Sequence, residues 1–165
     1  TMNFWIDLKR PALKELLSRV DVFFVNEGEA RKLTGEASSC RAARTLAEWG
    51  PSVVVVKKGE HGALLVAQDR IFAFPAFPVE DVRDPTGAGD AFAGGFLGYL
   101  CASGGPGDLQ RVKRAVLYGS VLASYNVQDF STRILEGLDR SVVEDRFRDF
   151  VELLGVGEPE AVPLR

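Results

Sequence analysis

The chain has 165 residues with a formal net charge of −3, and 46% of its residues are hydrophobic. These values suit one globular domain with a hydrophobic core. They exclude the strongly basic field by which proteins attract nucleic acid or anionic membranes. The longest purely aliphatic run, at residues 53–56, is far too short to span a bilayer. We therefore expect no nucleic-acid partner and no membrane partner.

The first third of the chain predicts helices that alternate with a strand. Residues 1–7, with the letters TMNFWID, are interpreted as the end of a strand, so the sequence is predicted to be a piece of a longer protein. An amphipathic helix is expected over 11–19, followed by a short buried strand over 22–25. A helix over 27–33 is then expected to stop at Gly35. Ser38 or Ser39 can cap the next helix, which extends to residue 49.

The middle of the chain predicts three strands. The run VVVV at residues 53–56 is the clearest buried strand in the sequence. The letters KGEHG at 58–62 turn the chain into a returning strand over 63–67. A second turn at 69–70 leads to a strand over 71–74. These turns predict antiparallel strands at one edge of the sheet.

The last part of the chain is predicted to be helical. A long helix should start at the glycine-rich segment near Gly87 and end around 103–107, and Asp108 can cap the next helix, over 109–125. A last helix is expected over 141–154, followed by a flexible tail over 155–165. The folded domain is thus assigned to 1–154. The alternation of strands and helices favours an α/β layered domain with a mostly parallel sheet.

The two cysteines, Cys40 and Cys101, lie in helix-like stretches and lack the spacing of a disulfide framework. We therefore expect both thiols to be reduced and buried, as is typical of a cytoplasmic protein.

Residues 84–92, with the letters DPTGAGDAF, are the most informative part of the chain. Pro85 disfavours helical geometry for the residue before it, so the helix must begin later. Gly87 and Gly89 have no side chain that would block a ligand, and the first amides of a helix lack an intrahelical acceptor. The segment predicts a site for phosphate oxygens, made by the N–H groups of Gly87, Ala88 and Gly89.

Asp90 follows inside the same helix, where the positive end of the helix dipole favours its ionised form. A carboxylate beside a phosphate site suits the phosphorylation of an alcohol, because the attacking oxygen must lose its proton. We interpret Asp90 as a general base. The alternative is structural. An aspartate can serve only as a dipole partner, and glycine-rich helices also arise from close packing, for which Gly94, Gly95 and Gly98 are candidates.

Three segments together resemble the PfkB family of ribokinase-like carbohydrate kinases, whose members phosphorylate sugars, nucleosides and related alcohols with ATP. Residues 84–92 resemble the C-terminal signature of that family. Residues 26–29 resemble its Asn-x-x-Glu motif, and residues 53–65 resemble its nucleotide-side strand-turn-strand. The resemblance extends from about Asp7 to Ser131 and implies a three-layer ribokinase-like fold with a mostly parallel central sheet.

The resemblance also implies cofactors. Asn26 and Glu29 would hold Mg²⁺ and its waters near the phosphates of ATP, because Mg²⁺ prefers oxygen ligands and retains water. The alternative for Glu29 is a solvated charge on a helix. Asp84 and Thr86 match positions that contribute to a K⁺ site in many relatives, and the alternative for Asp84 is a helix cap.

The remaining implied contacts are with the nucleotide. The residues implied to lie near it are Lys57, Gly59, Gly62, Tyr118 and Val121. Lys57 stands where relatives often carry threonine. The adenine base would lie between residues 59–79 and the helix that contains Tyr118.

Relatives also carry an N-terminal half that grips the acceptor and a small β lid, neither of which is present in the sequence. We therefore predict that the 165 residues alone have negligible kinase activity, and that a homodimer is an option only for the full-length protein. A sugar is the preferred acceptor. The alternatives are a nucleoside kinase of the adenosine type and a non-catalytic nucleotide-binding regulatory protein of the same fold. A dinucleotide-binding oxidoreductase is disfavoured because no Gly-x-Gly-x-x-Gly motif follows a strand.

Overall fold

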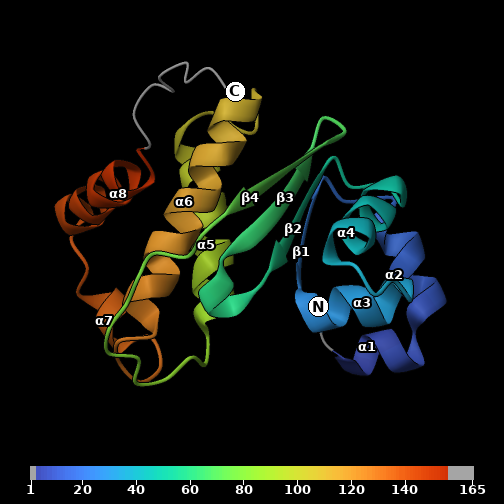
Figure 1. Cartoon of the computed structure of the whole chain (residues 1–165), viewed down its shortest axis with the longest axis horizontal. Helices are drawn as coiled ribbons and strands as arrows, with labels where there is room; N and C mark the ends of the chain where they lie inside the picture. Colours follow the sequence, from blue (N-terminus) through green and yellow to red (C-terminus); the bar gives the residue numbers. More distant parts are fainter. Residues whose placement is uncertain (1–2, 156–165) are drawn as a thin grey trace, which may run out of the picture.

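A four-stranded sheet forms the centre of the computed structural model, which describes residues 3–155 (Figure 1). In spatial order the strands are β1 (Val22–Asn26), β2 (Val53–Lys57), β3 (Ala63–Ala67) and β4 (Arg70–Phe74). β1 and β2 are parallel, whereas β2 pairs with β3, and β3 with β4, in antiparallel fashion. The expectation of a mostly parallel sheet is therefore wrong, while the expected antiparallel edge is present.

Two tight turns explain the antiparallel pairing. The turn between β2 and β3 contains the 3-10 helix η1 (Gly59–His61) and ends at Gly62, whose φ is 85°. The turn between β3 and β4 has only two residues, Gln68 and Asp69, with φ values of 50° and 58°. Two successive left-handed residues give the hairpin turn whose twist matches that of the strands, so the chain reverses without a crossover helix.

Helices cover both faces of the sheet, which gives the expected three layers (Figure 1). Within residues 3–155 they are α1 (Asn3–Leu8), α2 (Arg10–Leu17), α3 (Glu27–Thr34), α4 (Ser39–Glu48), α5 (Ala88–Ala102), α6 (Leu109–Asn126), α7 (Arg133–Glu136) and α8 (Arg140–Leu154). α3 and α4 pack on one face of the sheet, and α5 and α6 pack on the other. α8 lies outside α6 and buries Phe150 against it.

The valines of β2 connect the two halves of the core. Val54 and Val56 pack toward α3 and α4, whereas Val53 and Val55 pack toward α5 and α6. All four are buried. Burial of one such side chain contributes about 1.5–3 kcal/mol. The uninterrupted apolar run in the sequence follows from this position, because a strand covered on both faces has no polar side.

Helix caps lie where the sequence predicts them. Gly35 ends α3 in the left-handed conformation, with a φ of 81°. Ser38 caps α4 by accepting a hydrogen bond from the amide of Arg41 at 3.5 Å. Asp108 caps α6 by accepting from the amide of Arg111 at 2.9 Å.

Two further expectations from the sequence are wrong. Residues 3–8 form α1 rather than the end of a strand, and the helix buries Ile6. A helix satisfies its own backbone groups, as in the bond from the Lys9 amide to the Trp5 carbonyl at 2.9 Å, whereas a strand needs a partner. Cys40 and Cys101 are free but exposed, not buried.

Most of the predicted tail over 155–165, and the first two residues of the predicted strand, lie outside the described residues. None of the helices in the described part of the chain combines the length and the hydrophobicity that a membrane span requires.

Candidate active site

The carboxyl ends of the two parallel strands lie side by side and position the candidate site. Asn26 ends β1, Lys57 ends β2, and the two residues are partners in the register. α3 begins directly after Asn26, so its amino end lies at this edge of the sheet. Ligands of α/β proteins commonly bind outside the carboxyl ends of parallel strands, where the amino ends of helices meet.

The start of α5 depends on the conformation of one glycine. Gly87 occupies the cap position with a φ of 84°, in the left-handed region that favours glycine. Within residues 3–155, the amides of Gly87 and Gly89 have no hydrogen-bond acceptor, whereas the amide of Ala88 donates to the Pro85 carbonyl at 3.2 Å. Two of the three amides predicted to bind phosphate are therefore available, and the third is engaged in a turn.

Asp90 lies in the first turn of α5 and its side chain is exposed. A hollow of about 510 Å³ opens beside it, and Gly87 and Asp90 both line this hollow. Leu122 and Leu135 contribute apolar lining from α6 and α7. The predicted base and the cap of α5 thus border one open space, and neither is enclosed in the core.

Lys57 connects β2 with the start of α5. Its Nζ donates to the carbonyl oxygen of Gly89 at 3.1 Å. A Cβ on Gly89 would lie only 2.5 Å from the same nitrogen, so a side chain at this position would displace the end of Lys57. Burial lowers the pKa of Lys57, while the nearby carboxylates of Asp90 and Glu29 act in the opposite direction. A cationic side chain therefore lies near both acidic residues.

Asn26 and Glu29 form a reciprocal capping box at the start of α3. The amide of Glu29 donates to Oδ1 of Asn26 at 2.8 Å, and the amide of Asn26 donates to Oε2 of Glu29 at 3.2 Å. Glu29 is only 7% exposed, so the alternative of a solvated helix charge is wrong. The two predicted Mg²⁺ ligands are held together before any ligand arrives.

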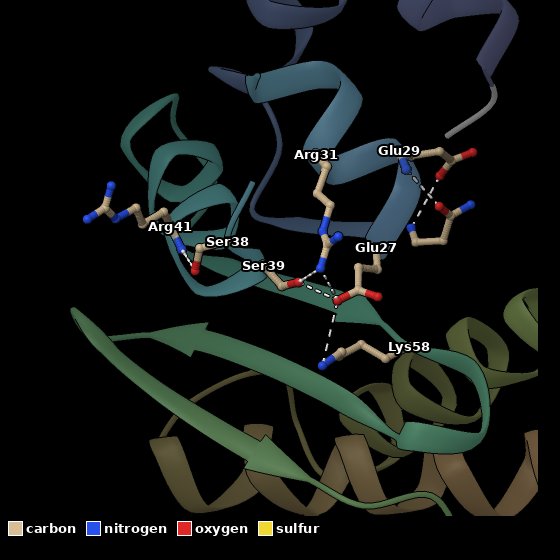
Figure 2. A network of polar contacts seen from close by, with 8 residues as sticks. Glu27, Glu29, Arg31, Ser38, Ser39, Arg41 and Lys58 are labelled. Atoms are coloured by element: carbon tan, nitrogen blue, oxygen red, sulfur yellow. Dashed lines mark hydrogen bonds and ion pairs between the residues drawn. The ribbon is translucent and has the colours of Figure 1, made fainter. Parts of the chain in front are cut away.

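Glu27, between these two residues, joins three segments of the chain. Its carboxylate accepts hydrogen bonds from the Ser39 hydroxyl and from Arg31, and it pairs with the ammonium of Lys58 at 3.6 Å. Figure 2 shows the three partners converging on this carboxylate from α3, α4 and the turn after β2. The hydrogen bond from Ser39 is the main reason that the pKa of Glu27 is lowered. No pattern in the sequence indicates this junction.

Asp84 and Thr86 interact directly with each other. The amide of Thr86 donates to Oδ1 of Asp84 at 2.9 Å. Hydrogen bonds from the hydroxyl and the amide of Thr86 lower the pKa of Asp84. Gly87, rather than Asp84, is the cap residue of α5, so the alternative of a helix cap for Asp84 is wrong. The role of both residues in a K⁺ site stays a prediction.

The residues predicted to contact the nucleotide fall into two groups. Gly59 and Gly62 lie in the turn that follows Lys57, and the carbonyl of Gly62 accepts from the amide of Lys58 at 2.8 Å. Both glycines have positive φ values, so this turn is specified by glycine. The turn directly follows the strand end that contacts α5.

The second group lies on α6, where it faces α8. The ring of Tyr118 stacks between those of Tyr99 and Phe147, at centroid distances of 4.5 and 4.2 Å, and its hydroxyl donates to Glu144 at 2.7 Å. Val121 is fully buried. Both faces of the Tyr118 ring are covered, so an adenine base could stack on it only after Tyr99 or Phe147 moves away. Contact of these residues with nucleotide stays a prediction.

Sequence reasoning assigned no role to Asn126, which ends α6. It is 1% exposed, and its Nδ2 donates to the carbonyl of Thr86 at 2.9 Å. It lines the same hollow as Asp90. No local pattern in the sequence indicates that this residue reaches the loop before α5.

The model of the pfkB family of carbohydrate kinases matches residues 2–136. The chain belongs to this family. It is 49% identical over 91 residues to the cytidine kinase of Thermococcus kodakarensis, covering 54% of this chain and 32% of the relative. It is 39% identical over 120 residues to the deoxyribokinase of Salmonella typhi, covering 67% of this chain and 38% of the relative.

The fold also matches that of solved pfkB-type kinases. The ribokinase of Arabidopsis thaliana, complexed with ribose and ATP, superposes with a TM-score of 0.69 at 27% identity. The match covers 82% of this chain and 43% of the ribokinase. The chain therefore spans between 32% and 43% of the length of these pfkB-family relatives.

Proposed function

We propose that this pfkB-family chain carries the catalytic residues of a kinase that transfers a phosphoryl group from ATP to a hydroxyl group of a sugar, either free or within a nucleoside. The observation that carries the proposal is the position of Asp90. Its exposed carboxylate borders the same hollow as Gly87, one helical turn from two amides without acceptors. A base and an anion site at this spacing fit proton removal and phosphoryl transfer in one step.

In the proposed reaction the acceptor hydroxyl gives its proton to Asp90 while its oxygen forms a bond to the γ-phosphorus. The bond from that phosphorus to the bridging oxygen breaks, and ADP leaves. The amides of Gly87 and Gly89 stabilise the negative charge on the transferred group. The amide of Ala88 joins them if its bond to Pro85 opens. The ammonium of Lys57, held at Gly89, adds positive charge beside them.

The oxygen donors at the start of α3 fit a role in binding Mg²⁺ with the nucleotide. Within residues 3–155, no three His, Cys, Asp or Glu side chains gather in a way that could hold a metal ion. Mg²⁺ commonly keeps several waters and uses one or two carboxylates together with substrate phosphates. We assign Asn26 and Glu29 to this task, through water. Mg²⁺ bound there would neutralise phosphate charge. Asp84 and Thr86 are assigned to a K⁺ site beside the cap of α5.

The nucleotide is assigned to the side of α5 that faces the turn after β2. Gly59 and Gly62 would let the backbone of this turn approach the phosphates closely, next to Lys57. Tyr118 and Val121 are assigned to the adenine side. The relation to a ribokinase complexed with ATP supports ATP as the donor.

The relatives support a sugar, free or within a nucleoside, as the acceptor class. A deoxyribokinase and a ribokinase among them support a free sugar. The identity of 49% to a cytidine kinase gives specific support to a nucleoside as the second candidate. Both candidates share a pentose hydroxyl as the group that Asp90 would deprotonate.

The test is an acceptor screen. The complete gene product that contains this sequence is incubated with ATP, Mg²⁺ and, in turn, ribose, 2-deoxyribose, cytidine and adenosine, and ADP release is measured. Turnover with at least one acceptor is expected, and negligible turnover is expected from residues 1–165 alone. Tight ATP binding without turnover on any alcohol would instead favour the regulatory alternative.

A further inference from the structure

The proposed function leaves one buried polar side chain at the site unexplained. Asn126 is 1% exposed and lies at the end of α6, where it does not cap its own helix, because the cap residue is Val127. Its Nδ2 crosses to the carbonyl of Thr86 at 2.9 Å. Its Oδ1 has no hydrogen-bond partner among residues 3–155, and the residue lines the hollow that contains Asp90.

The hydrogen bond to Thr86 explains how this amide can be buried. Burying a side-chain amide without a hydrogen bond destabilises a fold, and Nδ2 avoids that cost through the Thr86 carbonyl. Only a donor can satisfy the Thr86 carbonyl, so the orientation of the amide is fixed, with Nδ2 toward the loop and Oδ1 toward the hollow. The side chain is therefore adapted to hold the loop.

The end of α6 holds the loop before α5 at two further points. The carbonyl of Val127 accepts from the amides of Arg83 and Asp84, at 2.8 and 3.3 Å. The next contact along the loop is at Gly87, which lies against the side-chain amide of Asn126. A Cβ on that glycine would be 3.5 Å from Nδ2. The backbone of 83–87 is thus fixed to α6 up to the residue whose φ directs the amides of the α5 start.

We infer that Asn126 is a positioning residue for the anion-binding start of α5. By holding the Thr86 carbonyl it keeps Gly87 in its left-handed conformation and keeps the amides of Gly87 and Gly89 directed at the transferred phosphoryl group. The inference rests on the proposed function for its catalytic consequence, but its structural consequence is independent of catalysis.

The first test measures how firmly the loop before α5 is held. Hydrogen exchange is measured for the peptide 84–91 in the complete gene product, for Asn126→Leu and for the control Tyr125→Phe. The control removes a bond of similar length, from the Tyr125 hydroxyl to the Val142 carbonyl at 3.0 Å, which points to α8. Exchange over 84–91 should rise about tenfold in Asn126→Leu and stay unchanged in the control.

The second test measures kcat and KM for the acceptor. In Asn126→Leu, kcat should fall about tenfold while KM for the acceptor stays within about twofold, because the transition state alone needs aligned amides. Tyr125→Phe should retain both values. If Asn126→Leu does not fold, Asn126→Asp replaces it, since it keeps the size of the side chain and puts an acceptor against the Thr86 carbonyl.

The outcomes separate the two proposals. Unchanged exchange over 84–91 in both Asn126 variants would overturn the positioning role, whatever the activity. Equal loss of kcat in Tyr125→Phe would also overturn it, because the effect would then be general destabilisation of α6. Absence of turnover in the unmodified protein would contradict the proposed function, and the exchange result would still decide the role of Asn126.

Discussion

Two neighbouring glycines of α5 should respond oppositely to replacement by alanine. A Cβ on Gly95 would lie 2.7 Å from the Tyr118 carbonyl and 3.1 Å from the side chain of Leu122, both on α6. A Cβ on Gly94 would meet nothing within 4 Å in the described part of the chain. One methyl group thus tests whether the close approach of α5 and α6 is required.

The magnitude follows from comparing the two variants. Both gain the helix propensity of alanine over glycine, up to about 1 kcal/mol, so this gain cancels in the difference. The contact at Gly95 is with backbone, which cannot swing aside, and overpacking of this kind costs about 1–3 kcal/mol. Gly95→Ala should therefore be about 1–3 kcal/mol less stable than Gly94→Ala. Gly94→Ala should be more stable than the unmodified chain.

The assay is urea unfolding of the 165-residue chain and of both variants, followed by circular dichroism. A lower midpoint for Gly95→Ala than for Gly94→Ala, at equal slope, is the expected result. Equal midpoints would refute the reasoning, because α5 and α6 would then separate at no cost.

The start of α3 supplies two further predictions. Asn26→Ala removes the capping box and should lower the stability by about 1 kcal/mol, measured by the urea midpoint; an unchanged midpoint would show that the cap adds nothing. Glu27→Gln should destabilise the chain at neutral pH. Because folding lowers the pKa of Glu27 from 4.5, mainly through Ser39, this stabilisation is present above pH 4.5 and is lost as pH falls through the folded-state value. The difference between Glu27→Gln and the unmodified chain should therefore shrink on acidification, and a constant difference would contradict the junction.

The sequence was informative wherever structure depends on neighbours along the chain. The valine run of β2 and the glycine cap of α5 were predicted because burial on both faces and a positive φ each leave a local pattern. Asp90 was found in the same way, from its place after Gly89. The family resemblance added the grouping of these local features into one site.

The parts that could not be predicted depend on contacts between distant residues. The bond from Asn126 to Thr86 spans 40 positions, and no periodicity records it. Three glycines of α5 were candidates for close packing, but only Gly95 approaches α6 closely, since a Cβ on Gly94 or Gly98 meets nothing within 4 Å among the described residues. The partner of a glycine decides its role, and the partner lies on another helix.

The most direct measurement on the proposed chemistry is the replacement Asp90→Asn in the complete gene product, with kcat and the dissociation constant of ATP measured on the same preparation. The amide keeps the size of the side chain but cannot accept the proton of the alcohol at neutral pH. We expect kcat to fall by about 10²–10⁴ while ATP binding is nearly unchanged. A kcat equal to that of the unmodified protein would contradict the role of Asp90 as the base.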